Sequence, residues 1–197
     1  MPVSIRQGQG RLLDSGIISF DSAVLAGSLI IASVNFAVTS VSDDAGNSYV
    51  IAYSSNLFAS FFCPSSIAGA RVLTINGSSL DPSGGLIILE ELTGVGLSSS
   101  AVVDGLSTDA VMDTTLASTG NFTTTQNGDF IYAAFLSYDS TDTLAGGGFT
   151  KIYQFAGIIF DEFQIQNTAG TLRATMSGFT TSPFIIHYGL GYGITPS

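Results

Sequence analysis

Hydrophobic and polar positions alternate along this chain in short runs, and the 3.6-residue period of an amphipathic helix is weak throughout. The runs are rich in Val, Ile, Phe, Tyr and Thr, and turn-forming residues separate them. The pattern predicts strands over residues 16–20, 28–38, 48–54, 57–62, 71–76, 85–92, 129–137, 149–155, 158–166, 171–177 and 183–190. Many short strands at regular spacing are typical of an antiparallel β-sandwich or barrel.

The two series of predicted strands resemble each other. Sliding residues 27–77 by 101 positions without a gap aligns ten identical pairs in 51 positions, where roughly four are expected by chance. This repeat predicts a duplication, with one half over residues 27–95 and the other over residues 128–192.

The remaining segments are assigned by composition. Residues 96–121 are polar and small, so we expect them to connect the halves. We expect the halves to interleave into a single domain over residues 21–197, a jelly-roll-like antiparallel β-sandwich of about ten to eleven strands. Residues 1–20 are expected to form an N-terminal arm and first strand. The first 15 residues and the Tyr/Gly-rich end over 188–197 are expected to bury apolar area against other chains.

The low content of charged residues and the negative net charge limit the kinds of partner that the chain can bind. Only 10% of the residues are charged and the net charge is −10, with a pI near 4.1. Sequence-independent binding of nucleic acid needs a basic surface, so we expect no nucleic-acid partner. The single cysteine, Cys63, excludes an intrachain disulfide framework. A surface with so few charges favours association with other chains.

Targeting signals are not evident. The N-terminus lacks the apolar segment of a secretory signal, and no apolar run reaches the 18 residues of a membrane helix. We therefore expect synthesis in a host cytoplasm without a signal peptide and no insertion into a membrane.

Nucleophilic catalysis is not supported by the motifs. His187 is the only imidazole, and a Gly-x-Ser-x-Gly nucleophile elbow is absent. A lone histidine in a strand is more often structural than catalytic. Cys63 ends an apolar run and is expected to act as a small buried hydrophobe.

Carboxylates are the stronger candidates for chemistry. Two doublets, Glu90-Glu91 and Asp161-Glu162, lie on predicted strands, and glycoside hydrolysis uses two carboxyl groups. The chain has no Trp for sugar stacking. Neighbouring residues on a strand face opposite ways, so one carboxylate of each doublet is expected to face solvent. We predict no hydrolase activity.

Two acidic loops contain oxygen ligands of the kind that calcium binds. The turn Asp43-Asp44-Ala45-Gly46-Asn47 and the loop with Asp139 and Asp142 carry acidic side chains, but EF-hand spacing is absent. Turn Asp and Asn residues normally cap their own backbone. The loop Gly146-Gly147-Gly148 lacks the Lys of a phosphate-binding P-loop. The analysis predicts no catalytic residue, no cofactor-binding residue and no essential metal.

Aromatic side chains offer a further alternative. If several tyrosines shared one face, they could stack on sugars; the seven are Tyr49, Tyr53, Tyr132, Tyr138, Tyr153, Tyr188 and Tyr192.

Several fragments together resemble a β-sandwich module of phage virion structural proteins and of large bacterial surface proteins. The fragments are Ala26-Gly27-Ser28-Leu29-Ile30, Asp44-Ala45-Gly46-Asn47-Ser48-Tyr49, Glu91-Leu92-Thr93-Gly94-Val95, Thr123-Thr124-Thr125-Gln126-Asn127-Gly128-Asp129, Asp161-Glu162-Phe163-Gln164 and Ala169-Gly170-Thr171. The resemblance implies a virion or cell-surface interaction role and carries no catalytic residues. The surface-protein version has a signal peptide and tandem copies. We expected neither here, which favours the phage version.

The expected function is therefore that of a non-enzymatic structural protein of a bacteriophage particle, in capsid decoration or in a tail or fibre. Its expected partners are copies of itself and other virion proteins. The alternatives are a carbohydrate-binding, lectin-like adhesin that binds surface glycans, and a subunit of an extracellular bacterial filament.

Overall fold

The computed structural model describes the backbone of most of the chain as antiparallel β-structure. The described residues are 2–13, 15–78, 85–112, 114–137, 140–179 and 186–195, with the side chains of residues 78, 112 and 140–142 left out. They form eighteen strands and no helix. The described part of the chain accordingly contains no helix with the length and hydropathy that a membrane crossing requires.

The chain divides into two compact units, Met1–Ala101 and Val102–Pro196. Every strand pair of the described residues lies within one unit. The structure therefore differs from the expected single interleaved sandwich over 21–197, because each half forms its own sheets. The strand number also exceeds the expected ten to eleven.

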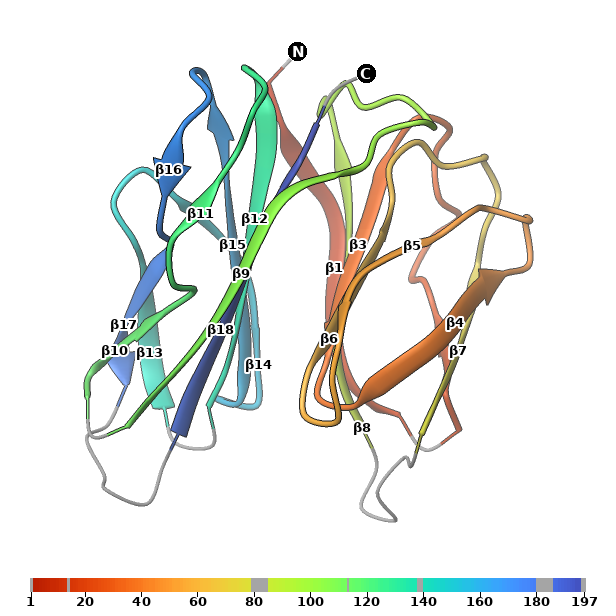
Figure 1. The fold of residues 1–197 in the computed structure, drawn as a ribbon. Coiled ribbons are helices and arrows are strands. Elements are labelled where there is room, and N and C mark those ends of the chain that lie inside the picture. Colours follow the sequence, from red (N-terminus) through yellow and green to blue (C-terminus); the bar gives the residue numbers. More distant parts are fainter. Residues whose placement is uncertain are drawn as a thin grey trace. The chain divides into compact units, whose positions relative to one another are not determined.

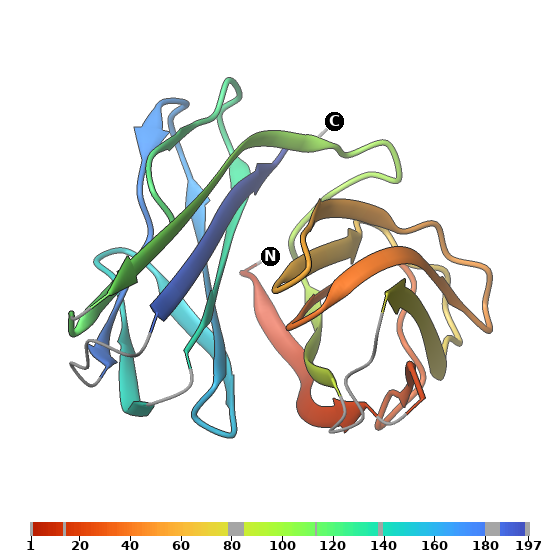
Figure 2. The same cartoon turned by 60° about the horizontal axis from the view of Figure 1, so that its bottom comes forward.

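The first unit consists of two sheets (Figures 1 and 2). The larger has the order β1 (Ser4–Leu13), β8 (Gly85–Thr93), β3 (Leu29–Val34), β6 (Ala59–Cys63) and β5 (Val50–Ser54). The smaller has the order β2 (Ile17–Ser19), β7 (Val72–Ser78) and β4 (Ala37–Asp43).

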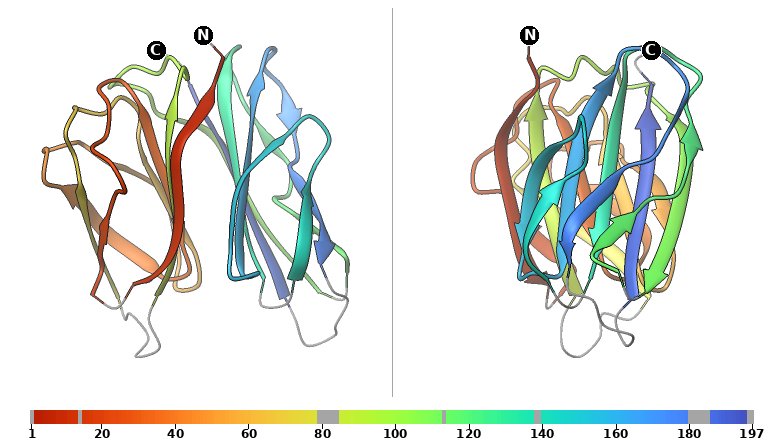
Figure 3. Two further views of the ribbon diagram at one scale, coloured as in Figure 1. Left: turned by 180° about the vertical axis from the view of Figure 1, so that it is seen from behind. Right: turned by 90° about the vertical axis from the view of Figure 1, so that its left-hand side faces the viewer.

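The second unit repeats this arrangement (Figure 3). Its larger sheet has the order β9 (Val103–Met112), β18 (Ile186–Ile194), β12 (Asp129–Leu136), β15 (Ile159–Gln166) and β14 (Thr150–Phe155). Its smaller sheet has the order β10 (Leu116–Ser118), β17 (Thr175–Phe179) and β13 (Ser140–Ala145). A short extra pair joins β11 (Phe122–Thr123) to β16 (Thr171–Leu172).

The strand orders of the two units are the same when β9, β18, β12, β15 and β14 replace β1, β8, β3, β6 and β5. The order β10-β17-β13 matches β2-β7-β4 in the same way. Register agrees too: Ile30 pairs with Cys63, and 101 positions later Ile131 pairs with Gln164. This is the arrangement that a duplication would produce.

Two segments that composition assigned as an arm and a connection are strands. β1 lies within residues 1–20 and β9 within residues 96–121, and each forms the sheet edge beside the last strand of its unit. Their glycines and polar residues hide the alternation, so pairing with β8 or β18 decides the structure. The Tyr/Gly-rich end is also no contact tail, because β18 pairs with β12 on one side and β9 on the other.

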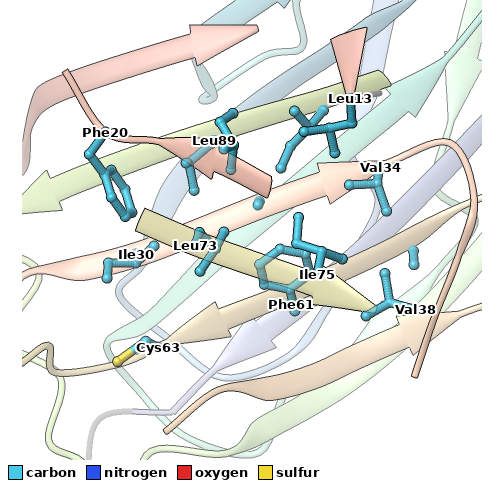
Figure 4. Packing of buried hydrophobic residues seen from close by; sticks show 14 of the residues in the cluster. Leu13, Phe20, Ile30, Val34, Val38, Phe61, Cys63, Leu73, Ile75 and Leu89 are labelled. Atoms are coloured by element: carbon cyan, nitrogen blue, oxygen red, sulfur yellow. The ribbon is translucent and has the colours of Figure 1, made fainter. Parts of the chain in front are cut away.

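The core of the first unit lies between its two sheets (Figure 4). Ile30, Phe61 and Leu89 of the larger sheet pack in one cluster with Leu73 and Ile75 of the smaller sheet, all nearly or fully buried. The second unit has an equivalent cluster built on Phe135, Phe160, Met176 and Phe179. Each large apolar side chain buried in this way contributes about 1.5–3 kcal/mol.

Three glycines on one face of β18 allow a second layer to approach closely. A Cβ added to Gly189 would lie 2.1 Å from the carbonyl oxygen of Ser118, and Cβ atoms on Gly191 and Gly193 would also meet the segment over 118–124. The alternation of glycine with larger residues in β18 therefore serves internal packing.

Gly189→Ala should destabilise the second unit by about 2–3 kcal/mol, because the new methyl group meets backbone atoms that cannot rotate away. Gly147→Ala is the matched control, since its Cβ would meet nothing within 4 Å. Urea unfolding followed by circular dichroism measures both. Equal stability of the two variants would contradict the close packing.

Candidate functional site

His187 has a structural environment. It is fully buried in β18 and its ring lies 4.7 Å from the ring of Phe179. Its Nε2 lies 3.1 Å from the carbonyl oxygen of Thr114 and its Nδ1 lies 2.8 Å from the hydroxyl of Ser137. Since a carbonyl oxygen only accepts, Nε2 carries the proton and Nδ1 accepts from Ser137. The imidazole thus joins three segments of the second unit, as the structural interpretation of this histidine predicts.

All four carboxylates of the two doublets are buried. Glu90, Glu91, Asp161 and Glu162 each have 0% exposure, so the expectation that one member of each doublet faces solvent is wrong. Strand alternation does place the members of each doublet on opposite faces of the sheet. The doublets also belong to different units. Neither doublet therefore presents two carboxyl groups to one side of a sheet, as a glycosidase pair requires.

Glu91 is the centre of a hydrogen-bond cluster in the first unit. One oxygen accepts from the backbone N–H of Leu25 and the hydroxyl of Ser28, both at 2.8 Å. The other accepts from the side chains of Arg6 and Gln7 of β1. The cluster ties β1 and the segment over 25–28 to β8. Arg6 is thus paired inside its own unit.

Asp161 is held by donors on its own sheet. It accepts from the hydroxyl of Tyr132 at 2.8 Å and from the backbone N–H of Tyr153 at 2.9 Å. Tyr153 follows a β-bulge in β14, and β5 has a bulge at the matching place before Tyr53. The Asp161 carboxylate thus completes the hydrogen bonding of an irregular edge strand.

Glu162 is only partly compensated by hydrogen bonds. One oxygen accepts from the backbone N–H of Gly146 at 3.0 Å, and the other has no hydrogen-bond partner. Burial, with a smaller contribution from the charge of Asp161, raises the pKa of Glu162 to about 8. The loop over 146–148, considered as a phosphate cradle, donates its first N–H to this carboxyl.

The Asp43 turn caps its own backbone, as turn chemistry predicts. Asp43 accepts from the N–H groups of Ala45 and Asn47 and from the hydroxyl of Tyr49 at 2.8 Å. Asp44 accepts from the N–H groups of residues 71 and 72. Although burial opposes it, the hydrogen bonds hold the pKa of Asp43 below its usual value. In the other loop considered for calcium, Asp139 and the side chain of Asp142 lie outside the described residues.

A small cavity adjoins this turn. Its volume is about 130 Å³, and its lining includes Asn47, Cys63, Ile67 and Ser99. Burial raises the pKa of the Cys63 thiol to about 11, so the thiol is protonated at neutral pH and is a poor nucleophile. The Cys63 side chain belongs to the core cluster, as predicted from sequence.

Three of the tyrosines pack within their own units. Tyr49 packs edge-on against Phe61 in the first unit. Tyr132 and Tyr192 lie 5.6 Å apart in the second unit, and both are fully buried. Tyr138 lies outside the described residues.

One pair of carboxylates escaped the sequence analysis. Asp104 of β9 and Asp129 of β12 come together at one end of the second unit, where Asp129 is fully buried. They belong to different strands and different turns, so no local motif joins them. Only the pairing of β9 and β12 with β18 reveals the pair.

The arrangement holds its polar groups mainly by internal hydrogen bonds. The hydroxyl that lies beside the imidazole, Ser137 next to His187, is fully buried together with it. Among the described residues, no cluster of three or more His, Cys, Asp or Glu side chains is placed to hold a metal ion. Comparison with known proteins adds no assignment: no protein family matches this chain, and no curated protein is significantly similar to it.

Proposed function

We propose that this chain is a non-enzymatic structural protein of a bacteriophage particle, which assembles through contacts with copies of itself and other virion proteins. The observation that carries the proposal is the nested strand pairing of each unit. In the first unit β1 pairs with β8, β2 with β7 and β3 with β6. This nesting supports a jelly-roll-like assignment, an architecture common in capsid and lectin domains. The step from fold to function is an analogy.

Exposed aliphatic side chains supply a contact surface in the second unit. On the outward face of its smaller sheet, Leu116 and Leu144 flank Ser177 in one row. Leu144 is 68% exposed and Leu116 is 41% exposed. Burial of two leucines in a contact favours association.

The two tandem units favour a second candidate. The surface-protein version of the module occurs in tandem copies, and this chain contains two units of one strand order. The absence of tandem copies, which favoured the phage version of the module over the surface-protein version, therefore does not hold for this chain. A lectin-like adhesin that binds surface glycans is therefore the alternative.

Immunogold labelling tests the location. Antibodies raised against the purified chain should label purified phage particles in electron micrographs, at regular positions on the capsid or tail. Label confined to the surface of uninfected bacteria would overturn the virion proposal and support the adhesin.

A substitution tests the contact surface. Leu144→Asp should weaken self-association or binding to particles by at least about tenfold, a change of about 1.4 kcal/mol. Ser42→Asp is the matched control, because Ser42 is exposed on β4, the strand of the first unit that corresponds to β13. Sedimentation velocity over a concentration series measures both variants. Unchanged association of Leu144→Asp would exclude this surface.

A further inference from the structure

The two units can be compared position by position at the end of the larger sheet. Leu92 of β8 and Ile194 of β18 occupy matching places, because they pair with Leu29 and Phe130, which are related by the 101-residue shift. Glu91 therefore corresponds to Gly193. On the edge strands, Ile5 and Val103 pair with these matching residues.

The following residues on the edge strands correspond as well. Arg6 follows Ile5 in β1 as Asp104 follows Val103 in β9, and each edge strand bulges within the next two residues, at Arg6 in β1 and at Gly105 in β9. Ser28, which donates to Glu91, matches Asp129 by the 101-residue shift. Three positions at one end of the sandwich thus differ in charge between the units.

In the first unit this place contains a cation. The guanidinium of Arg6 contacts the fully buried carboxylate of Glu91. Ser28 and the backbone N–H of Leu25 complete the hydrogen bonding of that carboxylate. The buried negative charge is therefore paired within the chain, which a buried carboxylate requires.

In the second unit a carboxylate fills the same region from a different strand, and the cation is lost. Gly193 has no side chain, and a Cβ there would lie 3.5 Å from a carboxylate oxygen of Asp129. The Asp129 carboxylate thus occupies the region that the Glu91 side chain enters in the first unit. In place of the arginine stands a second acid, Asp104, whose carboxylate approaches that of Asp129.

The Asp129 carboxylate lacks the donors that Glu91 has. It is fully buried, and neither of its oxygens has a donor at full hydrogen-bond geometry among the described residues. The hydroxyls of Thr124 and Thr195 and the carboxyl of Asp104 lie close to it. The two ion pairs between described residues, Arg6–Glu91 and Arg11–Asp21, both lie in the first unit. No described basic side chain therefore forms an ion pair with Asp104 or Asp129.

We propose that a divalent cation, Ca²⁺ by its ligand set, binds between Asp104 and Asp129 at the place that corresponds to the Arg6 guanidinium. The oxygens available to a cation are those of the two carboxylates, the backbone carbonyl of Asp104, and the hydroxyls of Thr124 and Thr195. The Asp104 carboxylate is also held by the N–H groups of Thr125 and Gln126 and by the hydroxyl of Thr125, which fix its position. Calcium takes six to eight such oxygens in flexible geometry, whereas zinc prefers nitrogen and sulfur. Asp104 is only partly buried, which gives a solution ion access.

This site revises the expectation of no essential metal. That expectation came from loops with several acids close in sequence, and the Asp43 turn is indeed self-capped. The proposed site draws on β9, the start of β12 and the end of β18, which meet only in the folded unit.

The experiment compares the full chain in EDTA with the chain in millimolar CaCl₂, at matched ionic strength. The Tm of the wild type should rise by about 5 °C or more at calcium concentrations far above Kd. Terbium luminescence sensitised by tyrosine provides a direct binding measurement. Asp129→Asn should lower terbium affinity at least about tenfold and remove the calcium-dependent rise in Tm.

Asp104→Arg is the sharpest variant, because it restores the arrangement of the first unit. It should bind no terbium, and its Tm should be the same in EDTA and in calcium, because the arginine occupies the place of the ion. Its absolute Tm is no criterion, since the substitution also removes the hydrogen bonds of Asp104 to Thr125 and Gln126. Asp21→Asn, at an exposed carboxylate, is the control and should titrate like the wild type.

Three results would overturn the proposal: no terbium binding by the wild type, an unchanged titration of Asp129→Asn, or stabilisation by acid alone. In the last case calcium would have no effect on the Tm, and the rise in Tm from pH 7.5 to pH 5 in EDTA would persist in Glu162→Gln, which removes the contribution of Glu162. The pair would then be neutralised by a shared proton.

Discussion

Glu162→Gln should remove an alkaline loss of stability from the second unit. The pKa of Glu162 is raised from 4.5 to about 8 in the folded chain, chiefly by burial. Between these two pH values the folded state holds a proton that the unfolded state has released. The free energy of unfolding therefore falls as the pH rises from about 4.5 to about 8 and is level above that range. The loss attributable to this group is at most about 5 kcal/mol.

Glutamine keeps the acceptor for Gly146 without the charge. The variant should match the wild type near pH 5, where Glu162 is neutral, and should be more stable by several kcal/mol at pH 9. Urea unfolding at both pH values measures the difference, and the pH 5 comparison is the internal control. A constant difference between the two proteins across this range would show that Glu162 ionises normally.

The same variant tests catalysis. Glycoside turnover by the wild type that Glu162→Gln abolishes would refute the prediction of no hydrolase activity.

The second large effect is expected at Glu91. Glu91→Gln removes the charge partner of Arg6 and weakens the acceptor for Ser28 and the N–H of Leu25. Breaking a buried ion pair at one partner costs about 3–5 kcal/mol. The first unit should therefore unfold at lower urea concentration, while the transition of the second unit stays unchanged.

A solvent-exposed ion pair, whose arginine lies on β1 like Arg6, is the matched control. Arg11 and Asp21 lie 3.1 Å apart with about half or more of each side chain exposed. Asp21→Asn should change the free energy of unfolding by less than about 1 kcal/mol, because solvent screens the pair. Similar losses for Glu91→Gln and Asp21→Asn would mean that burial of the Glu91 cluster has no energetic consequence.

The position of Glu91 also changes the expected effect of truncation. A flexible arm could be removed without loss of the sandwich, as the sequence analysis expected for residues 1–13. In the structure these residues include β1 and the buried Leu13. Their removal would expose the edge of β8 and leave the Glu91 carboxylate without Arg6 and Gln7, so the truncated unit should be destabilised.

The all-β class and the repeat could be predicted because they depend on local and periodic signals. Short runs rich in Phe, Ile and other apolar residues define strands such as β6 and β12, and turn residues separate them. The shift of 101 positions between the halves reflects identical residues at matching places, among them Ile30 and Ile131. The structural role of His187 could be predicted because the sequence has no nucleophile motif to accompany it, and that of Cys63 because it ends an apolar run.

The tertiary structure alone decided how the halves close and where the charges meet. Whether β8 pairs with β3 of its own half or with β12 depends on contacts between residues far apart in sequence, which periodicity does not record. The burial of Glu90 and Asp161 and the approach of Asp104 to Asp129 depend on the same pairings. Charge compensation is a property of three-dimensional neighbours, so the exchange of Arg6 for Asp104 became visible only when strand register aligned the two units.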